Sequence, residues 1–384
     1  MKNIYDILSK EKGITLAKDI YLPVDKRGNT NTLIIGGSGS GKSSSFIIPN
    51  ILNMLGSYVI TDPLGELYER TYKYLEKSGY EVKTINIENS KHNYNYDPFN
   101  HINDYTDVDK LAEILIGEEP DEFWNESSKA LLKTIIYYVL EKAEKKDLLT
   151  VFYLLTTKKE ELFEKFNEFE LCSKGAKYAA LLKAFPEKTY ASIVSTAIIK
   201  LAFVIDKVND DRNFNREFDF TDLKKKKMAI FIGFKENSKT DIRQANIVIS
   251  QILSQLNSRM DASEKVYFLL DGVGMIGKII NLPSSVLLGR ANNISLHLIS
   301  NSVGSLEKIY GDEFYGMLNT IDTQVLLGTN LKKDFEYFAE FFSMEPKEIK
   351  ESWNNDKVII SEKGLGLIEG RKDYFFDNPE FKDI

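Results

Sequence analysis

Hydrophobic and polar positions alternate in blocks along the first hundred residues, and these blocks predict strands and helices in turn. Three short apolar runs, at 32–36, 58–62 and 81–87, have the length of buried strands. Between them, residues 42–55 and 66–79 repeat apolar side chains at helical spacing, and the second helix ends in a glycine, a common C-cap residue. Strands that alternate with helices of this length predict βαβ units on a parallel sheet.

The pattern changes over residues 105–210. Apolar side chains in this range recur with helical periodicity, and no run within it has the character of a strand. We therefore predict an all-α domain inserted into the alternating part of the chain.

Apolar strands resume after the helical range, at 228–234, 266–271, 294–300 and 323–329. Residues 357–376 then alternate apolar and polar side chains around glycines, as an edge hairpin does. The predicted fold class is α/β, with a mostly parallel sheet. Its domain is discontinuous, formed by residues 1–104 and 211–384.

Composition limits the class of protein. With 43% hydrophobic and 12% aromatic residues, the chain can bury a sizeable core. A formal net charge of −7 excludes a globally basic nucleic-acid binder, although a local basic patch such as the four lysines at 224–227 stays compatible with it. The more ordinary interpretation of that run is a solvated entry to the next strand.

Compartment and metal content follow from a few residue types. The single cysteine, Cys172, forms no intrachain disulfide, which fits a reducing cytoplasm, and the three histidines have no metal-ligand spacing. Residues 1–20 lack the features of a secretory signal, and no window contains the roughly 18 uncharged apolar residues that a membrane helix needs. We expect a soluble, cytoplasmic chain.

The turn after the first apolar strand has the pattern of a phosphate-binding loop. Gly36, four further residues and then Gly41-Lys42-Ser43 match the P-loop motif in strand–loop–helix context. Glycines let backbone N–H groups converge on phosphate oxygens, and the start of a helix adds its positive dipole end. The residues expected to bind the nucleotide are Gly36, Gly37, Ser38, Gly39, Ser40, Gly41, Lys42, Ser43 and Ser44.

Two side chains of this loop have specific predicted roles. Lys42 would bridge the β- and γ-phosphates, and the Ser43 hydroxyl would bind Mg²⁺. A P-loop also needs an acidic partner at the end of another buried strand. Asp271 ends the apolar run 266–270, so we predict it as the second metal residue. The guanine-recognition sequence N-K-x-D does not occur, which argues against a GTPase.

Several segments together resemble one family, the type IV secretion coupling proteins, or TraG/TraD-type ATPases of conjugative DNA transfer. The resemblance runs from about residue 18 to residue 377. The segments that carry it, in order, are GGSGSGKSSSFIIPNIL, YVITDPLGELYERT, YNYDPFN, DEFWNESSKALL, LLGRANNISLHLISNSVGSLEKIYG and VLLGTN.

The resemblance implies a RecA-like nucleotide-binding domain with an inserted all-α domain, and ATP and Mg²⁺ as cofactors. It implies hexamers that deliver a relaxase-bound DNA strand, or proteins, to a membrane channel. Arg290 matches the position of an arginine finger that reaches a neighbouring subunit. From spacing alone, Arg290 is as well explained as a cation at a helix C-terminus. Asp62 lies at a family motif, or it caps the following helix.

Four departures from the family pattern bear on activity. The usual pair of N-terminal membrane helices is missing from this sequence, and Leu64 replaces a lysine. Gly272 follows Asp271 where a glutamate that polarises the attacking water is expected. Asn301 stands where a glutamine contacts the γ-phosphate. The sequence therefore leaves open an ATPase that binds ATP firmly and hydrolyses it slowly.

The leading functional prediction is an ATP-binding coupling protein that recruits relaxase–DNA or protein substrates to a type IV secretion channel. Its expected partners are the relaxase, the channel ATPase and membrane components, and DNA bound weakly and without sequence preference. It would act at the inner face of the bacterial membrane through these partners. The alternatives are a nucleotide-dependent scaffold that does not pump, and a cytoplasmic DNA translocase unrelated to secretion.

Overall fold

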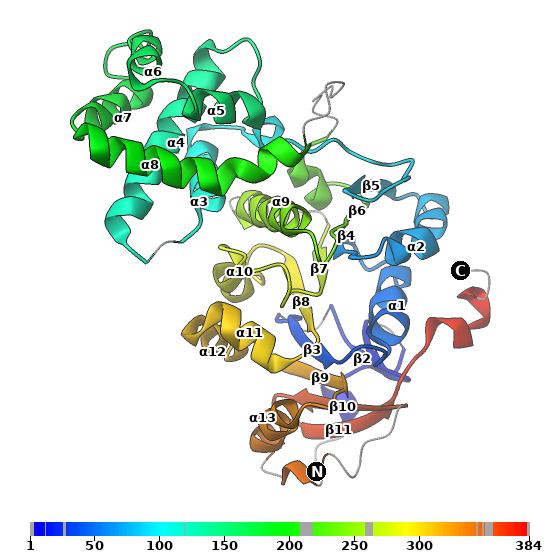
Figure 1. Ribbon diagram of the computed structural model, residues 1–384. Helices are drawn as coiled ribbons and strands as arrows, with labels where there is room; N and C mark the ends of the chain where they lie inside the picture. The colour runs from blue at the N-terminus through cyan, green and yellow to red at the C-terminus, as the bar shows by residue number, and fades with distance from the viewer. Residues whose placement is uncertain are drawn as a thin grey trace. The chain divides into compact units, whose positions relative to one another are not determined.

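The computed structural model describes residues 4–11, 13–25, 28–118, 120–207, 218–257, 264–342, 345–347, 349 and 356–381. The chain divides into two compact units (Figure 1). The sheet unit comprises Met1–Tyr94, Thr221–Asn246 and Leu256–Ile384, and the helical unit comprises Asn95–Phe220 and Ile247–Gln255. The range predicted for the helical insertion, 105–210, falls inside the helical unit.

A nine-stranded sheet organises the first unit, in the order β11-β10-β9-β3-β8-β7-β4-β6-β5. Its strands β3 to β9 pair in parallel, and β10 and β11 add an antiparallel edge hairpin. The mostly parallel α/β fold predicted from the sequence is confirmed. The strands are β3 (Thr32–Gly36), β4 (Ser57–Thr61), β5 (Glu81–Ile85), β6 (Met228–Ile232), β7 (Val266–Asp271), β8 (Ile294–Ser300), β9 (Thr323–Gly328), β10 (Lys357–Glu362) and β11 (Gly366–Arg371).

The central strands are apolar because helices cover both faces of the sheet. Every residue of β3, β4, β6 and β8 is buried. Figure 1 shows α1 and α2 on one side of the sheet and α10, α11 and α12 on the other. These helices are α1 (Ile48–Leu52), α2 (Glu66–Lys77), α10 (Leu282–Leu288), α11 (Val303–Tyr310) and α12 (Asp312–Leu318), with α9 (Lys239–Asn257) and α13 (Lys332–Phe342) also in the chain.

The helix after the phosphate loop differs from the regular helix predicted for 42–55. It begins as a π-helical turn at Ser43–Ile47 and continues as α1 to Leu52. Pro49 explains the wide turn, because a proline has no N–H to donate to the preceding turn and its ring crowds that turn.

A small hairpin near the N-terminus was not predicted. Strands β1 (Ile14–Ala17) and β2 (Ile20–Leu22) pair in antiparallel fashion. Asn50 of α1 holds this hairpin: its side-chain oxygen accepts from Thr15 N at 2.8 Å, and its amide donates to Thr15 O at 3.0 Å. The pattern of the chain gives little sign of strands this short.

Regular structure in the described part of the helical unit is helical throughout. The helices are α3 (Tyr105–Ile116), α4 (Glu122–Lys142), α5 (Leu148–Leu155), α6 (Lys159–Phe166), α7 (Lys174–Lys183) and α8 (Glu187–Leu201). Aspartates 104, 121 and 147 cap α3, α4 and α5 by accepting backbone N–H groups, which fixes where each helix begins. The long α4 packs against α3, α5, α7 and α8 and forms the centre of the unit.

One stretch among the described residues, Glu187–Ile205, is long and apolar enough to cross a membrane by length and composition alone. It is α8 together with the 3₁₀ turn that follows. One side of α8 packs against α3, α4 and α5, but only 22% of this apolar stretch is buried, so most of it is not a core helix.

Candidate functional site

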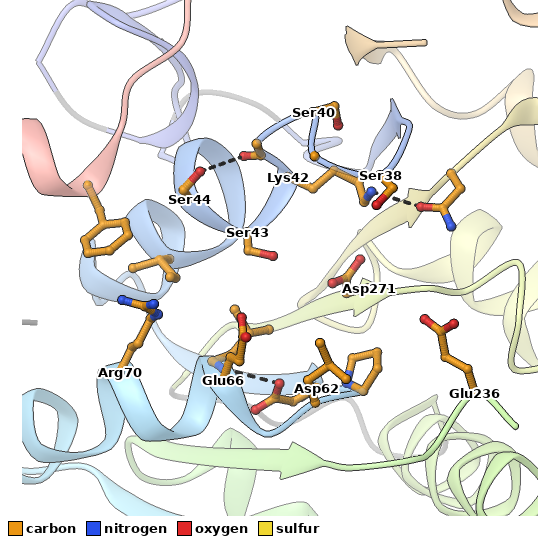
Figure 2. Close-up of a pocket in the computed structure, with 18 of the residues that line it drawn as sticks. Ser38, Ser40, Lys42, Ser43, Ser44, Asp62, Glu66, Arg70, Glu236 and Asp271 are labelled. Carbon is orange, nitrogen blue, oxygen red and sulfur yellow. Dashed lines mark hydrogen bonds between the residues drawn. The ribbon is translucent and has the colours of Figure 1, made fainter. Parts of the chain in front are cut away.

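The carboxyl ends of the parallel strands meet at one edge of the sheet, where ligands of open α/β folds bind. A pocket of about 510 Å³ lies there, built from the segments that follow β3, β4, β6, β7 and β8. Figure 2 shows the pocket and the side chains around it. Its lining includes Ser38–Ser44, Asp62, Leu64, Glu66, Arg70, Glu236, Asp271, Met275, Asn301, Phe375 and Phe376.

The phosphate loop has a conformation that its glycines make accessible. Gly39 and Gly41 have φ of 72° and 85°, in the left-handed region that other residues rarely adopt. A Cβ at Gly36 would lie 2.4 Å from Ser40 Oγ, so this close approach also requires glycine. Ser40 Oγ is buried and has no hydrogen-bond partner among the described residues. A hydroxyl without a protein partner in this loop has a donor available for a ligand oxygen.

The Lys42 ammonium group turns toward the loop itself. Its Nζ donates to Gly36 O at 2.7 Å, to Gly37 O at 3.0 Å and to Asn301 Oδ1 at 2.9 Å. Burial lowers the pKa of Lys42, while the charges of Asp271 and Glu236 act in the opposite direction. A partly buried cation held between acidic groups is suited to replace those carbonyl contacts with phosphate oxygens.

Ser43 and Asp271, the two predicted metal residues, line the same pocket, and Figure 2 shows both side chains facing into it. Burial raises the pKa of Asp271, and the Lys42 charge and the Gly272 N–H oppose that shift. Thr61 Oγ1 donates to Asp271 O at 2.7 Å and so ties the end of β7 to β4. One hydroxyl and one carboxylate, completed by water and phosphate oxygens, suit Mg²⁺, which keeps much of its own hydration.

The remaining predicted residues differ in position. Asn301 follows β8 and lies in the pocket, bonded to Lys42. Arg290 lies outside the pocket lining, in the exposed turn after α10, close to Gly28. A single chain therefore does not bring Arg290 to the phosphate loop, and its role as an arginine finger stays a prediction about an assembly.

Asp62 serves as a helix cap. Its carboxylate accepts from Leu67 N at 3.2 Å and from Tyr68 N at 2.8 Å, which satisfies two free N–H groups at the start of α2. Burial raises the pKa of Asp62 to about 6, although these N–H groups favour the charged form. The capping interpretation of Asp62 accounts for its position without a ligand.

The pocket also contains residues that sequence reasoning missed. Glu236 follows β6, Glu66 and Arg70 lie on α2, and Phe375 and Phe376 come from a 3₁₀ turn near the C-terminus. One signal could have identified Glu236. It lies four residues beyond an apolar strand that was itself predicted, and the carboxyl ends of parallel strands share one edge. The aromatic residues gave no such signal, because their segment lies far from the loop in sequence.

Comparison with solved structures shows the fold. The plasmid coupling protein TrwB in complex with ADP and Mg²⁺ aligns with a TM-score of 0.77 at 14% identity, over 97% of this chain and 91% of that one. The VirB4 protein of Thermoanaerobacter pseudethanolicus aligns with a TM-score of 0.58 at 14% identity, over 98% and 99% of the two chains.

Curated sequences add more specific relatives. Two Escherichia coli proteins described as conjugal transfer protein TraG are each 24% identical to this chain, over 73% and 80% of its length. The chain spans about half the length of these relatives, 49% and 55% respectively.

The family model for type IV secretory system conjugative DNA transfer matches residues 2–342, which include the phosphate loop, Asp271 and the helical unit between them. This match covers most of the chain and agrees with the resemblance found in the sequence motifs. The chain belongs to the type IV secretory system conjugative DNA transfer family.

Proposed function

We propose that this chain is an ATP-dependent coupling protein that brings DNA–protein or protein substrates to a type IV secretion channel. The observation that carries the proposal is the convergence of Lys42, Ser43 and Asp271 on one pocket in a member of this family. The related TrwB structures hold ADP with Mg²⁺, or a non-hydrolysable ATP analogue, which supports ATP and Mg²⁺ as the ligands here.

Different residues would contact the phosphates, the metal ion and a neighbouring subunit. Backbone N–H groups of Gly39 and Gly41 and the start of the following helix would cradle the phosphates, and Lys42 would place its charge between the β- and γ-phosphates. Ser43 and Asp271 would hold Mg²⁺, which neutralises charge that develops on the phosphates. Arg290 would reach the pocket of a neighbouring subunit, which requires assembly, and the proposed assembly is a hexamer.

The proposed substrates and partners are a relaxase with its DNA strand or a secreted protein, and the membrane components and ATPase of the channel. The proposed place of action is the cytoplasmic face of the bacterial membrane, reached through these partners. Direct DNA binding by this chain would be weak and salt-sensitive.

The lysine run at 224–227 gives little support to a DNA contact. Lys224 is buried and donates to Leu256 O at 2.7 Å, and burial lowers its pKa to about 8. Lys226 pairs with Glu81 at 2.6 Å, and Lys225 pairs with Asp222 at 3.1 Å. Lys224, Lys225 and Lys226 each have a partner within the protein, so the run is better explained as part of the fold.

The second candidate function is a nucleotide-dependent scaffold without a motor. Gly272 and Asn301 favour it, because neither reproduces the side chain expected to act on the attacking water or the γ-phosphate. The family match makes a translocase unrelated to secretion the weakest of the three hypotheses.

The test is steady-state ATP hydrolysis with and without single-stranded DNA, beside an equilibrium nucleotide-binding assay. A coupling ATPase should bind ATP and hydrolyse it, and DNA should raise the rate. Binding without turnover under every condition would favour the scaffold. Failure to bind ATP would exclude both.

A further inference from the structure

The part of the pocket where an attacking water is expected lies beside Gly272, which provides no functional group. Gly272 has φ of 70°, so the backbone itself favours glycine there. A Cβ at this position would lie 2.6 Å from Met275 Cε and 3.5 Å from Phe234 Cζ. The space that a side chain at 272 would enter is therefore filled mainly by Met275, and Phe234, from the loop that follows β6, lies at contact distance beside it.

That loop carries a carboxylate. Glu236 lies two residues beyond Phe234, in the turn between β6 and α9, and its exposed side chain lines the pocket with Lys42, Asp271 and Asn301. Figure 2 shows the Glu236 carboxylate directed into the pocket on the side of Asp271. Its charge acts on both Lys42 and Asp271, as its position in the pocket requires.

Two other carboxylates of the pocket are less suited to act on a water. Asp62 is held by the Leu67 and Tyr68 N–H groups as a helix cap. Glu66 begins α2 and lines the pocket on the side of that helix, whereas Glu236 enters from the loop after β6. Lys42 is expected to contact the β- and γ-phosphates. Of these carboxylates, Glu236 is the one that enters the pocket beside Lys42 and Asp271 and does not cap a helix.

We propose that Glu236 orients and deprotonates the water that attacks the γ-phosphate, replacing the glutamate that Gly272 lacks. This inference rests on the proposed function as an ATP-binding protein. A carboxylate supplied by a separate strand can do the work of one adjacent to the metal residue, because catalysis depends on geometry at the reacting atoms and not on chain order.

The step balances without a further reactant. The water oxygen forms a bond to the γ-phosphorus as the bond from that phosphorus to the β–γ bridging oxygen breaks. One water proton passes to a Glu236 carboxylate oxygen and is later released to solvent or phosphate. The products are ADP and inorganic phosphate.

The experiment compares Glu236→Gln with wild type in the full chain, in the presence of Mg²⁺, single-stranded DNA and protein concentrations that promote assembly. Glu88→Gln is the matched control, because Glu88 bonds the adjacent Lys235 at 2.6 Å and lies outside the lining of this pocket. Turnover, equilibrium affinity for a non-hydrolysable ATP analogue and thermal unfolding are measured for each protein. In a separate assay, the bound nucleotide is identified as ATP or ADP after the time that the wild type needs for one turnover.

Glu236→Gln should lower kcat by about 10²–10⁴-fold, while affinity and unfolding temperature stay at the wild-type values. Its bound nucleotide should remain ATP when the wild type has formed ADP. Glu236→Asp should retain intermediate turnover, and Glu88→Gln should match the wild type.

Three results would overturn the inference: wild-type turnover in Glu236→Gln, loss of nucleotide affinity together with turnover, or a wild type that binds ATP and never hydrolyses it. The first two leave the proposed coupling function intact, and the third favours the scaffold. A wild type that fails to bind ATP would remove the proposed function as well.

Discussion

The two sides of the pocket differ in how closely they follow the pattern of their family. On the phosphate side, the loop Gly36–Ser43 matches its motif in full and has the positive φ angles that the motif requires. On the water side, Gly272 and Asn301 stand where the resemblance implies longer side chains, and Glu236 enters the pocket from the loop after β6. Backbone geometry permits few solutions for cradling phosphates, whereas a single carboxylate can reach a water from several positions.

The largest expected effect distinguishes the contribution of the Mg²⁺ ligand Asp271 from that of the phosphate loop. Asp271→Asn removes the carboxylate expected to hold Mg²⁺ and leaves the phosphate loop unchanged. We expect turnover to fall by about 10²–10³-fold, because the metal's charge stabilisation is lost where charge develops. The affinity for nucleotide measured without Mg²⁺ should differ between Asp271→Asn and wild type by a much smaller factor than turnover does. Equal turnover in the two proteins would show that Asp271 does not hold the metal.

The second prediction concerns β3 and β8, the strands that lead to the phosphate loop and to Asn301. His297 of β8 is buried and bonds Thr32 Oγ1 of β3 at 2.8 Å and Ser295 Oγ at 3.2 Å. Burial, together with the charge of Lys265, lowers the pKa of His297 to about 3, and the Tyr267 ring stacks against it. An unfolded histidine has a pKa near 6.5, so the unfolded chain binds a proton first as the pH falls.

The stability contributed by neutral His297 is therefore complete above pH of about 6.5 and decreases as the pH falls toward 3. The loss should reach about 2 kcal/mol between pH 6.5 and 5. Denaturant unfolding of wild type and His297→Gln across this range measures it. The free energy of unfolding of the variant should depend less steeply on pH, by the slope that corresponds to about one bound proton. Identical slopes would mean that burial does not lower the pKa of His297 in the folded protein.

The third prediction tests the water side directly. Gly272→Ala and Gly272→Glu both place a Cβ on a backbone with φ of 70°, so each should lower the free energy of unfolding by about 1–2 kcal/mol. If the missing glutamate alone limited turnover, Gly272→Glu would raise kcat. With Glu236 already supplying a carboxylate, we expect the glutamate variant to turn over no faster than the alanine variant. Faster turnover than both alanine variant and wild type would contradict the role of Glu236.

The fourth and smallest effect is on the phosphate side. Ser40→Ala removes a buried hydroxyl that has no partner among the described residues. The folded protein loses no hydrogen bond, so its stability should stay the same or rise slightly. Affinity for an ATP analogue should decrease by about 1 kcal/mol, because a bond to phosphate is lost. Unchanged affinity in a calorimetric titration would place Ser40 away from the phosphates.

Much of this molecule could be predicted from local sequence. The strands β3 and β7 are short apolar runs with turn residues after them, and such runs form strands wherever the sheet buries them. The place of Asp271 in the pocket could be predicted because its strand ends in an acid, and its role in holding Mg²⁺ stays a prediction. Arg290 could not be placed, since its proposed target lies on another subunit.

Other features depend on contacts between distant parts of the chain. The hairpin of β1 and β2 is short and is held by Asn50. Phe375 and Phe376 reach the pocket only through the tertiary fold. Glu236 is an intermediate case: its strand was predicted, and the shared edge of a parallel sheet would have drawn attention to it.

We expect this pocket to hold a nucleoside triphosphate against Lys42. Equilibrium titration of a non-hydrolysable ATP analogue, in the presence of Mg²⁺, into wild type and Lys42→Ala measures this contact. The wild type should bind, and the variant should lose about 2–4 kcal/mol of binding free energy, because the cation aimed at the phosphates is removed. Equal affinities, with both proteins folded, would contradict it.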